Sequence, residues 1–112
     1  MANKTFNIPS EFLGTYYNCW FVSGTYMVDE TSLAIWVESP NGNIGNVTVY
    51  LGEVPKDCAY IDVNNFPEII EVLERLGVAK PTGIYTRSGF VEYPLYQFDR
   101  EKLCEYERGE NE

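Results

Sequence analysis

The side chains of this chain that could do chemistry are its thiols and one pair of nearby carboxylates. Cys19, Cys58 and Cys104 are too far apart for the short spacing of a zinc or redox pair. The chain has no histidine, so neither a Ser–His nor a Cys–His nucleophile pair can form. Asp57 and Asp62 flank an expected short strand and point to opposite faces of it. No glycine motif for phosphate binding occurs. We therefore expect no enzyme activity, no catalytic residues, no metal site and no cofactor.

The cysteine count and the apolar runs indicate the compartment. Three cysteines are an odd number, which argues against a disulfide framework and predicts buried or half-buried free thiols. The segment 1–6 lacks the apolar stretch of a secretory signal, and no apolar run is longer than Leu33–Val37. We expect a cytoplasmic protein that does not interact with membranes.

Charge excludes one class of partner. Seventeen acidic residues against eight basic ones leave a net charge of −9. The basic residues are too few and too scattered to follow a nucleic-acid backbone, so we expect no direct binding of nucleic acid. The acidic residues are also dispersed, with local density only over residues 101–112, and a solvated surface explains them better than a charge-based function.

Aromatic residues carry the binding potential of the sequence. They make up 15% of the chain, and nine of them are tyrosines, a side chain that interfaces favour. Trp36 and Tyr50 fall on the faces of two expected neighbouring strands that lie opposite the aliphatic residues. They form either a second minor core or a surface for a protein partner or for self-association. The same question arises for Tyr16, Tyr17, Tyr93 and Tyr96.

Alternating apolar residues predict three strands in the first half of the chain, at residues 16–28, 32–38 and 46–51. The turn signal Asn41-Gly42 separates the last two, so we expect an antiparallel meander. We expect an irregular lead-in over residues 1–14 and a further short strand over residues 59–63.

The second half predicts two helices. The first covers residues 66–76, with Asn65 and Glu68 as a capping box and Gly77 just past its end. A loop around residues 80–83 precedes a strand-like run over residues 90–98, which Pro94 restricts to an edge or broken strand. A short helix over residues 99–108 and a frayed tail over residues 109–112 complete the chain. One apolar stripe marks the core face of the first helix: Phe66, Ile69, Ile70, Leu73 and Leu76.

The order of these elements is typical of an α+β fold. We expect one domain over residues 1–112: a two-layer arrangement with the 66–76 helix on one face of the meander and a short C-terminal helix.

Three segments carry a resemblance to a known family. Residues 8–17 (IPSEFLGTYY), 57–65 (DCAYIDVNN) and 88–99, with SGF and YPLYQFD, resemble the uncharacterised bacterial domain-of-unknown-function family 4313. The resemblance covers nearly the whole chain. It implies a small cytoplasmic protein of gut-type bacteria, often carried on mobile elements, and supplies no catalytic residues.

Two function classes follow. The first is a protein-binding accessory or modulator factor that uses an aromatic surface, for which an exposed flat patch is the discriminating feature. The second is a small-ligand binding domain, for which a concave aromatic pocket with converging polar groups is required.

Overall fold

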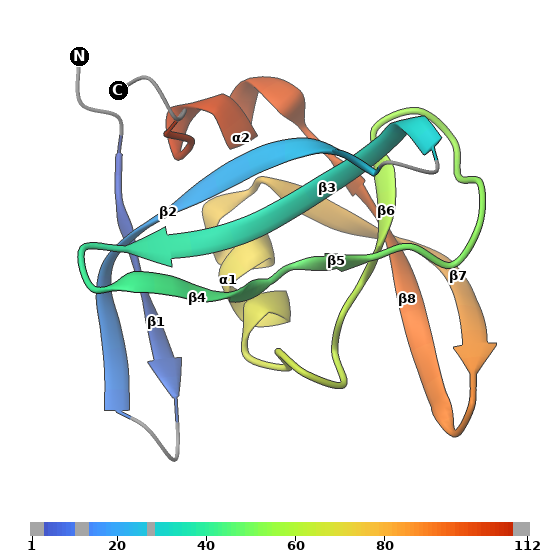
Figure 1. Ribbon diagram of the computed structural model, residues 1–112, viewed down its shortest axis with the longest axis horizontal. Coiled ribbons are helices and arrows are strands. Elements are labelled where there is room, and N and C mark those ends of the chain that lie inside the picture. The colour runs from blue at the N-terminus through green and yellow to red at the C-terminus, as the bar shows by residue number, and fades with distance from the viewer. Residues whose placement is uncertain (1–3, 11–13, 27–28, 109–112) are drawn as a thin grey trace.

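Two antiparallel sheets build the protein. The computed structural model describes residues 4–10, 14–26 and 29–108. The first sheet contains β1 (Phe6–Ser10), β2 (Gly14–Tyr26), β3 (Asp29–Ser39) and β4 (Gly42–Asn46), in that order (Figure 1). The second sheet, in the order β5-β6-β8-β7, contains β5 (Thr48–Val49), β6 (Cys58–Ile61), β7 (Ala79–Ser88) and β8 (Val91–Phe98). With helices α1 (Ile69–Leu76) and α2 (Arg100–Glu105), these strands confirm the α+β class.

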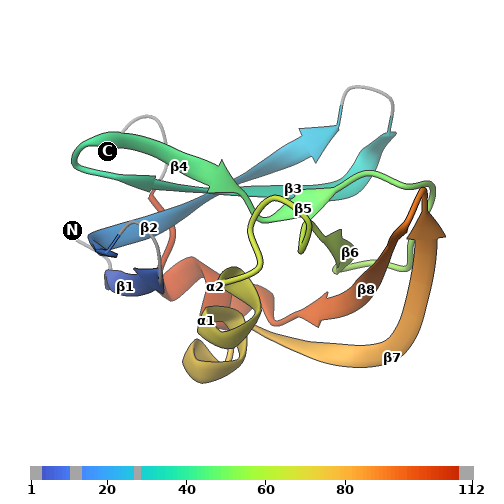
Figure 2. The same cartoon turned by 90° about the horizontal axis from the view of Figure 1, so that it is seen from below.

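The side-chain alternation of β3 sets the core face of the first sheet. Leu33, Ile35 and Val37 are buried, whereas Ala34 and Trp36 between them are half-buried. Figure 2 shows α1, α2 and the β7–β8 pair on one side of the first sheet. The aliphatic face of β3 therefore meets both the helices and the second sheet in one core. Its largest fully buried side chains include Ile8, Phe21, Ile35, Ile61, Ile69, Leu73 and Leu103.

The expected third strand over residues 46–51 is wrong as a single element. At Val47 the chain leaves the first sheet: the Val47 N–H donates to the Ile35 carbonyl, while the Val47 carbonyl accepts from the Asp62 N–H. The next residue, Thr48, is buried, and its Oγ1 accepts from the Ile35 N–H at 3.0 Å, which offsets the cost of burying the hydroxyl. Val47 is thus a corner that joins the two sheets, and β4 and β5 belong to different ones.

Helix α1 begins later than its sequence pattern suggested. The N-cap is Glu68, which makes no side-chain capping bond, and Asn65 instead donates to the Asp62 carboxylate from Nδ2 at 3.1 Å. A turn from Asp62 to Phe66 therefore occupies the expected first helical turn. At the other end Gly77 has a φ of 72°, the left-handed value that glycine tolerates, as predicted.

The second helix forms, although it ends at Glu105 rather than near Arg108, and its buried Leu103 closes the core. Asp99 is its N-cap, and the carboxylate accepts from the backbone N–H groups of Glu101 and Lys102. Beyond the helix, the Phe21 N–H donates to the Tyr106 carbonyl, and the Phe21 carbonyl accepts from Arg108. The C-terminal segment therefore forms a clasp along β2.

Two further expectations differ from the structure, and a third is not tested by it. The lead-in contains β1, whose Phe6 and Ile8 are buried in the core against β2. The loop expected at residues 80–83 is a bulge inside β7 rather than a break between elements. The tail 109–112 lies outside the described residues. Among the described residues, no helix is long and apolar enough to cross a membrane.

Strand β8 is interior rather than an edge, with β6 and β7 as its neighbours. Pro94 is tolerated because β6 pairs only with residues Leu95 to Gln97, so at Pro94 the strand has a single neighbour, Tyr85 of β7. A proline lacks only the N–H that a second neighbour would need.

Candidate functional site

A hairpin extends beyond the end of the second sheet. Strand β8 has eight residues and β7 has ten, but β6 has only four, so the far ends of β7 and β8 pair only with each other. We call this hairpin, residues 84–94, the arm (Figure 1). None of its residues is buried, although it forms part of a regular ladder. The arm is therefore a structured element without a core of its own.

The arm carries most of the large apolar side chains that the described surface exposes. Ile84 is 54% exposed, Tyr85 is 60% exposed and Phe90 is 100% exposed. The fourth, Tyr17, lies on β2 and is 63% exposed beside a groove at the β3–β4 turn. A cluster of exposed apolar residues on one element is unusual for a monomer surface and marks interaction sites.

A tight turn holds Phe90 at the tip of the arm. Ser88 and Val91 are paired, which leaves Gly89 and Phe90 as a two-residue loop. Gly89 has a φ of 64°, the positive angle that a type II′ turn requires at its first central position. This turn is among those that suit the twist of a hairpin, so the ladder fixes the backbone that presents the Phe90 ring.

Among the described residues, no strand pairs with the outer edge of β7. The two halves of this edge differ in whether they carry features that prevent another strand from pairing. The first half carries three features that prevent another strand from pairing with it: Lys80, Pro81 and a bulge between Pro81 and Tyr85. Within that bulge Ile84 donates its N–H to Thr82 Oγ1 at 3.2 Å. The second half, residues 85–88, pairs with β8 in regular register and has no such feature except Arg87. The unprotected edge is therefore confined to the arm.

Two hydroxyl contacts anchor the arm where it joins the body. On one face Thr86 Oγ1 donates to the Tyr60 hydroxyl at 2.7 Å, which ties β7 to β6. On the opposite face the Tyr96 hydroxyl donates to Glu74 of α1 at 2.5 Å. Burial of Tyr96, together with this bond to a carboxylate, raises the pKa of the phenol above its ordinary value. These contacts hold the base of the arm against the body, and neither of them involves a residue at the tip of the arm.

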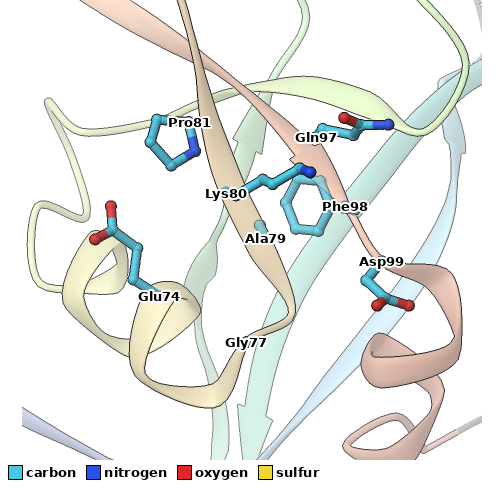
Figure 3. Close-up of a pocket in the computed structure, with 8 residues that line it drawn as sticks. All are labelled: Glu74, Gly77, Ala79, Lys80, Pro81, Gln97, Phe98 and Asp99. Carbon is cyan, nitrogen blue, oxygen red and sulfur yellow. The ribbon is translucent and has the colours of Figure 1, made fainter.

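A shallow groove of about 550 Å³ runs between α1 and the start of β7. Figure 3 shows Glu74 from α1, Lys80 from β7 and Asp99 at the start of α2 around it. Phe98 is the sole aromatic residue that lines the groove, and it is only 3% exposed. The Asp99 carboxylate already accepts hydrogen bonds as the N-cap of α2. The groove is thus not the concave aromatic pocket that small-ligand binding would need. Its lining residues are Glu74, Gly77, Ala79, Lys80, Pro81, Gln97, Phe98 and Asp99.

The structure separates the aromatic residues that the sequence grouped as a candidate surface. Trp36 lies in β3 of the first sheet, whereas Tyr50 follows β5 of the second, so the two do not share one sheet face. Both are half-buried. Tyr96 is 4% exposed and faces the core, so it cannot belong to a surface. Tyr93 is half-buried on the arm, and of the four it is the one that lies beside the exposed apolar cluster.

Contacts on the outer face of the first sheet explain the position of Trp36. Its indole N–H donates to Glu38 at 2.9 Å, and its ring lies over Gly24, where an added Cβ would sit 3.7 Å from it. Val22, the cross-strand neighbour of Trp36, is buried. The ring therefore lies along the sheet over β2 rather than projecting from it.

Sequence reasoning missed Ile84, Tyr85 and Phe90. The missed signal was available at residues 84–93, where Ser88-Gly89-Phe90-Val91 separates two β-prone runs as a two-residue hairpin loop does. Pro81 and Gly83 had suggested a loop, which concealed β7. A fully exposed Phe90 could not be inferred, because exposure depends on the shortness of β6.

The groups with chemical potential remain apart in the structure. Asp57 pairs with Arg100 at 3.5 Å, while buried Asp62 accepts from Asn65. Cys19 and Cys58 are buried free thiols, but Cys104 is exposed, contrary to the expectation of burial. Burial raises the pKa of the Cys19 thiol and that of the Cys58 thiol, which keeps both in the unreactive protonated form. Within the described residues, no cluster of three or more Cys, Asp or Glu side chains could hold a metal ion.

Comparison with known proteins gives one match. The family model described as "Domain of unknown function (DUF4313)" matches residues 23–112. No curated protein and no solved structure matches the chain.

Proposed function

The chain belongs to the DUF4313 family, and we propose that it is a non-enzymatic accessory factor that binds a protein partner through the arm. The observation that carries this proposal is the placement of Ile84, Tyr85 and Phe90 on one projecting hairpin. We place its action in the cytoplasm and, as the family resemblance implies, on behalf of a mobile element.

The chemistry of the arm suits a protein surface as its partner. Aromatic side chains bring large contact area at a small entropic cost and are typical binding anchors. Residues 75–91 contain no acidic residue but include Arg75, Lys80 and Arg87. The β7 strand of the arm therefore has none of the carboxylates that give the rest of the chain its negative charge, and Glu92 on β8 is the one acidic residue of the arm. A partner that docks along β7 meets less of that repulsion.

Site-directed photo-crosslinking in the native host tests this function. A photoreactive phenylalanine analogue at position 90 should form a covalent adduct of one discrete mass. The same analogue at position 17, an exposed aromatic site on β2, should not. The change Tyr85→Ser should abolish the adduct from position 90 without unfolding the chain, because Tyr85 is exposed. Absence of any adduct from position 90, or equal adducts from both positions, would contradict the proposal.

A further inference from the structure

The free edge of the arm has a geometry that identifies its partner more closely. In a two-residue hairpin loop, the flanking residues form the hydrogen-bonded pair, here Ser88 with Val91. Pairs then alternate along the ladder, so Tyr85 with Pro94 and Arg87 with Glu92 are non-hydrogen-bonded pairs. This assignment agrees with Pro94, which has no N–H to donate. The backbone groups of Tyr85 and Arg87 consequently point outward, to the side where β7 has no neighbour.

We propose that this edge pairs with the same edge of a second copy, so that two β7 strands join antiparallel about a two-fold axis at Thr86. The proposal rests on the proposed function of the arm as a protein-binding element. In this register Tyr85 of each copy lies opposite Arg87 of the other, and each pair exchanges its outward N–H and C=O groups. The result is one continuous sheet in the order β5-β6-β8-β7-β7-β8-β6-β5.

The side chains of the edge complement themselves in this register. Tyr85 and Arg87 are two residues apart and therefore project from the same face of β7. Placed opposite each other across the axis, they form two equivalent contacts between a guanidinium and an aromatic ring. No like charges face each other directly. Within the described residues, neither Lys80 nor Arg87 has an ion pair that such contacts would have to break.

Charge distribution also favours this edge over other contacts between copies. Each copy carries a net charge of −9, which opposes association through most of the surface. The edge is part of the run 75–91 that has no acidic residue, so the two β7 strands meet without a carboxylate of their own. Glu92, the one acidic residue of the arm, lies one strand inward on β8, paired with Arg87. A short strand pair with a few apolar side chains buries little area, and we therefore expect a weak, concentration-dependent dimer.

Sedimentation measurements from about 1 µM to about 500 µM test the pairing. The wild-type chain should shift from monomer to dimer across this range. Tyr85→Lys, which sets like charges opposite each other, should weaken the dimer about tenfold, because two equivalent pairs are affected. Tyr85→Glu, the matched variant, sets opposite charges there and should retain the dimer. A monomeric wild type at the highest concentration, or equal loss in both variants, overturns the proposal.

Disulfide trapping tests the register of the proposed β7–β7 pairing directly. In a Cys104→Ser background, which removes the exposed thiol, Thr86→Cys should crosslink two copies under mild oxidation, because residues on the axis face each other in a non-hydrogen-bonded pair. Arg87→Cys in the same background should not. Crosslinking through position 87 alone would overturn the register. A photo-adduct from position 90 with a different protein, together with a monomeric chain, would retain the proposed function and reject the second copy.

Discussion

The first sheet and the arm are both built of antiparallel strands, but the first sheet buries its apolar side chains and the arm exposes them. In β3 the residues Leu33, Ile35 and Val37 are buried under helices and a second sheet. In the arm, Ile84, Tyr85 and Phe90 are exposed. The difference arises from the neighbours: β2 accompanies β3 along most of its length, whereas β6 ends after four residues and leaves β7 and β8 to continue alone. Exposure here follows from strand length, not from residue type.

The sharpest test of this contrast is a pair of truncations. Leu73→Ala removes a fully buried side chain of α1 and should lower the free energy of unfolding by roughly 2–5 kcal/mol. Phe90→Ala removes a larger side chain from the tip of the arm and should change it by less than about 0.5 kcal/mol. Chemical denaturation of both variants provides the measurement. Comparable losses would mean that the arm packs against the body in solution.

Trp36 lies between these two extremes and tests whether the outer face of the first sheet is a minor core. Its ring covers Gly24 and its indole N–H is bonded to Glu38. Trp36→Ala should therefore lower the free energy of unfolding by roughly 1–3 kcal/mol, less than a change in the main core. The denaturant midpoint reports the change, with Glu38→Gln as a control that retains a hydrogen-bond acceptor. An unchanged midpoint would instead identify a bare aromatic surface.

A smaller effect than that of Trp36→Ala is expected at the junction between the body and the arm. Tyr96→Phe removes the bond to Glu74 and should cost about 1 kcal/mol near neutral pH. Because the folded state raises the pKa of Tyr96 above 10.0, it holds a proton that the unfolded chain loses near pH 10. The stability linked to this proton is complete below that pH and is lost as the pH rises above it.

The wild type should consequently lose more stability than Tyr96→Phe between about pH 8 and pH 12, as measured by denaturation at each pH. Glu74→Gln serves as the matched control, since it keeps an acceptor but removes the neighbouring charge that helps to raise the pKa. Parallel pH profiles for the wild type and Tyr96→Phe would show that Tyr96 titrates normally.

Local signals in the sequence predicted the elements whose determinants are local. The alternation in β3, the left-handed Gly77 and the short helix after Asp99 were all readable from neighbouring residues. The change of sheet at Val47 was not, because it depends on hydrogen bonds to Ile35 and Asp62, which are distant in sequence. A continuous alternating run gives no sign that its two halves pair with different strands.

The candidate site could be predicted even less well. Aromatic content directed attention to tyrosine and tryptophan side chains, but it selected Tyr96, which is in the core, and omitted the exposed Phe90. Exposure at Phe90 depends on where β6 stops, and on the side of the arm β6 stops at Ile61, where the turn from Asp62 to Phe66 begins. A property of a neighbouring strand cannot be read from the residues of the arm itself.

The clasp along β2 determines the order in which the molecule can fold. Lys4 pairs with Glu105 across a sequence separation of 101, and Ser23 bonds to Glu107 across 84. Contacts of such long range form late, because most of the chain must be confined before they can be made. The arm needs only a two-residue loop to close, which hairpins achieve within microseconds. During synthesis the unpaired edge of β7 therefore forms before the core beneath β2 is complete, and we expect incorrect strand pairing to be most frequent in that interval.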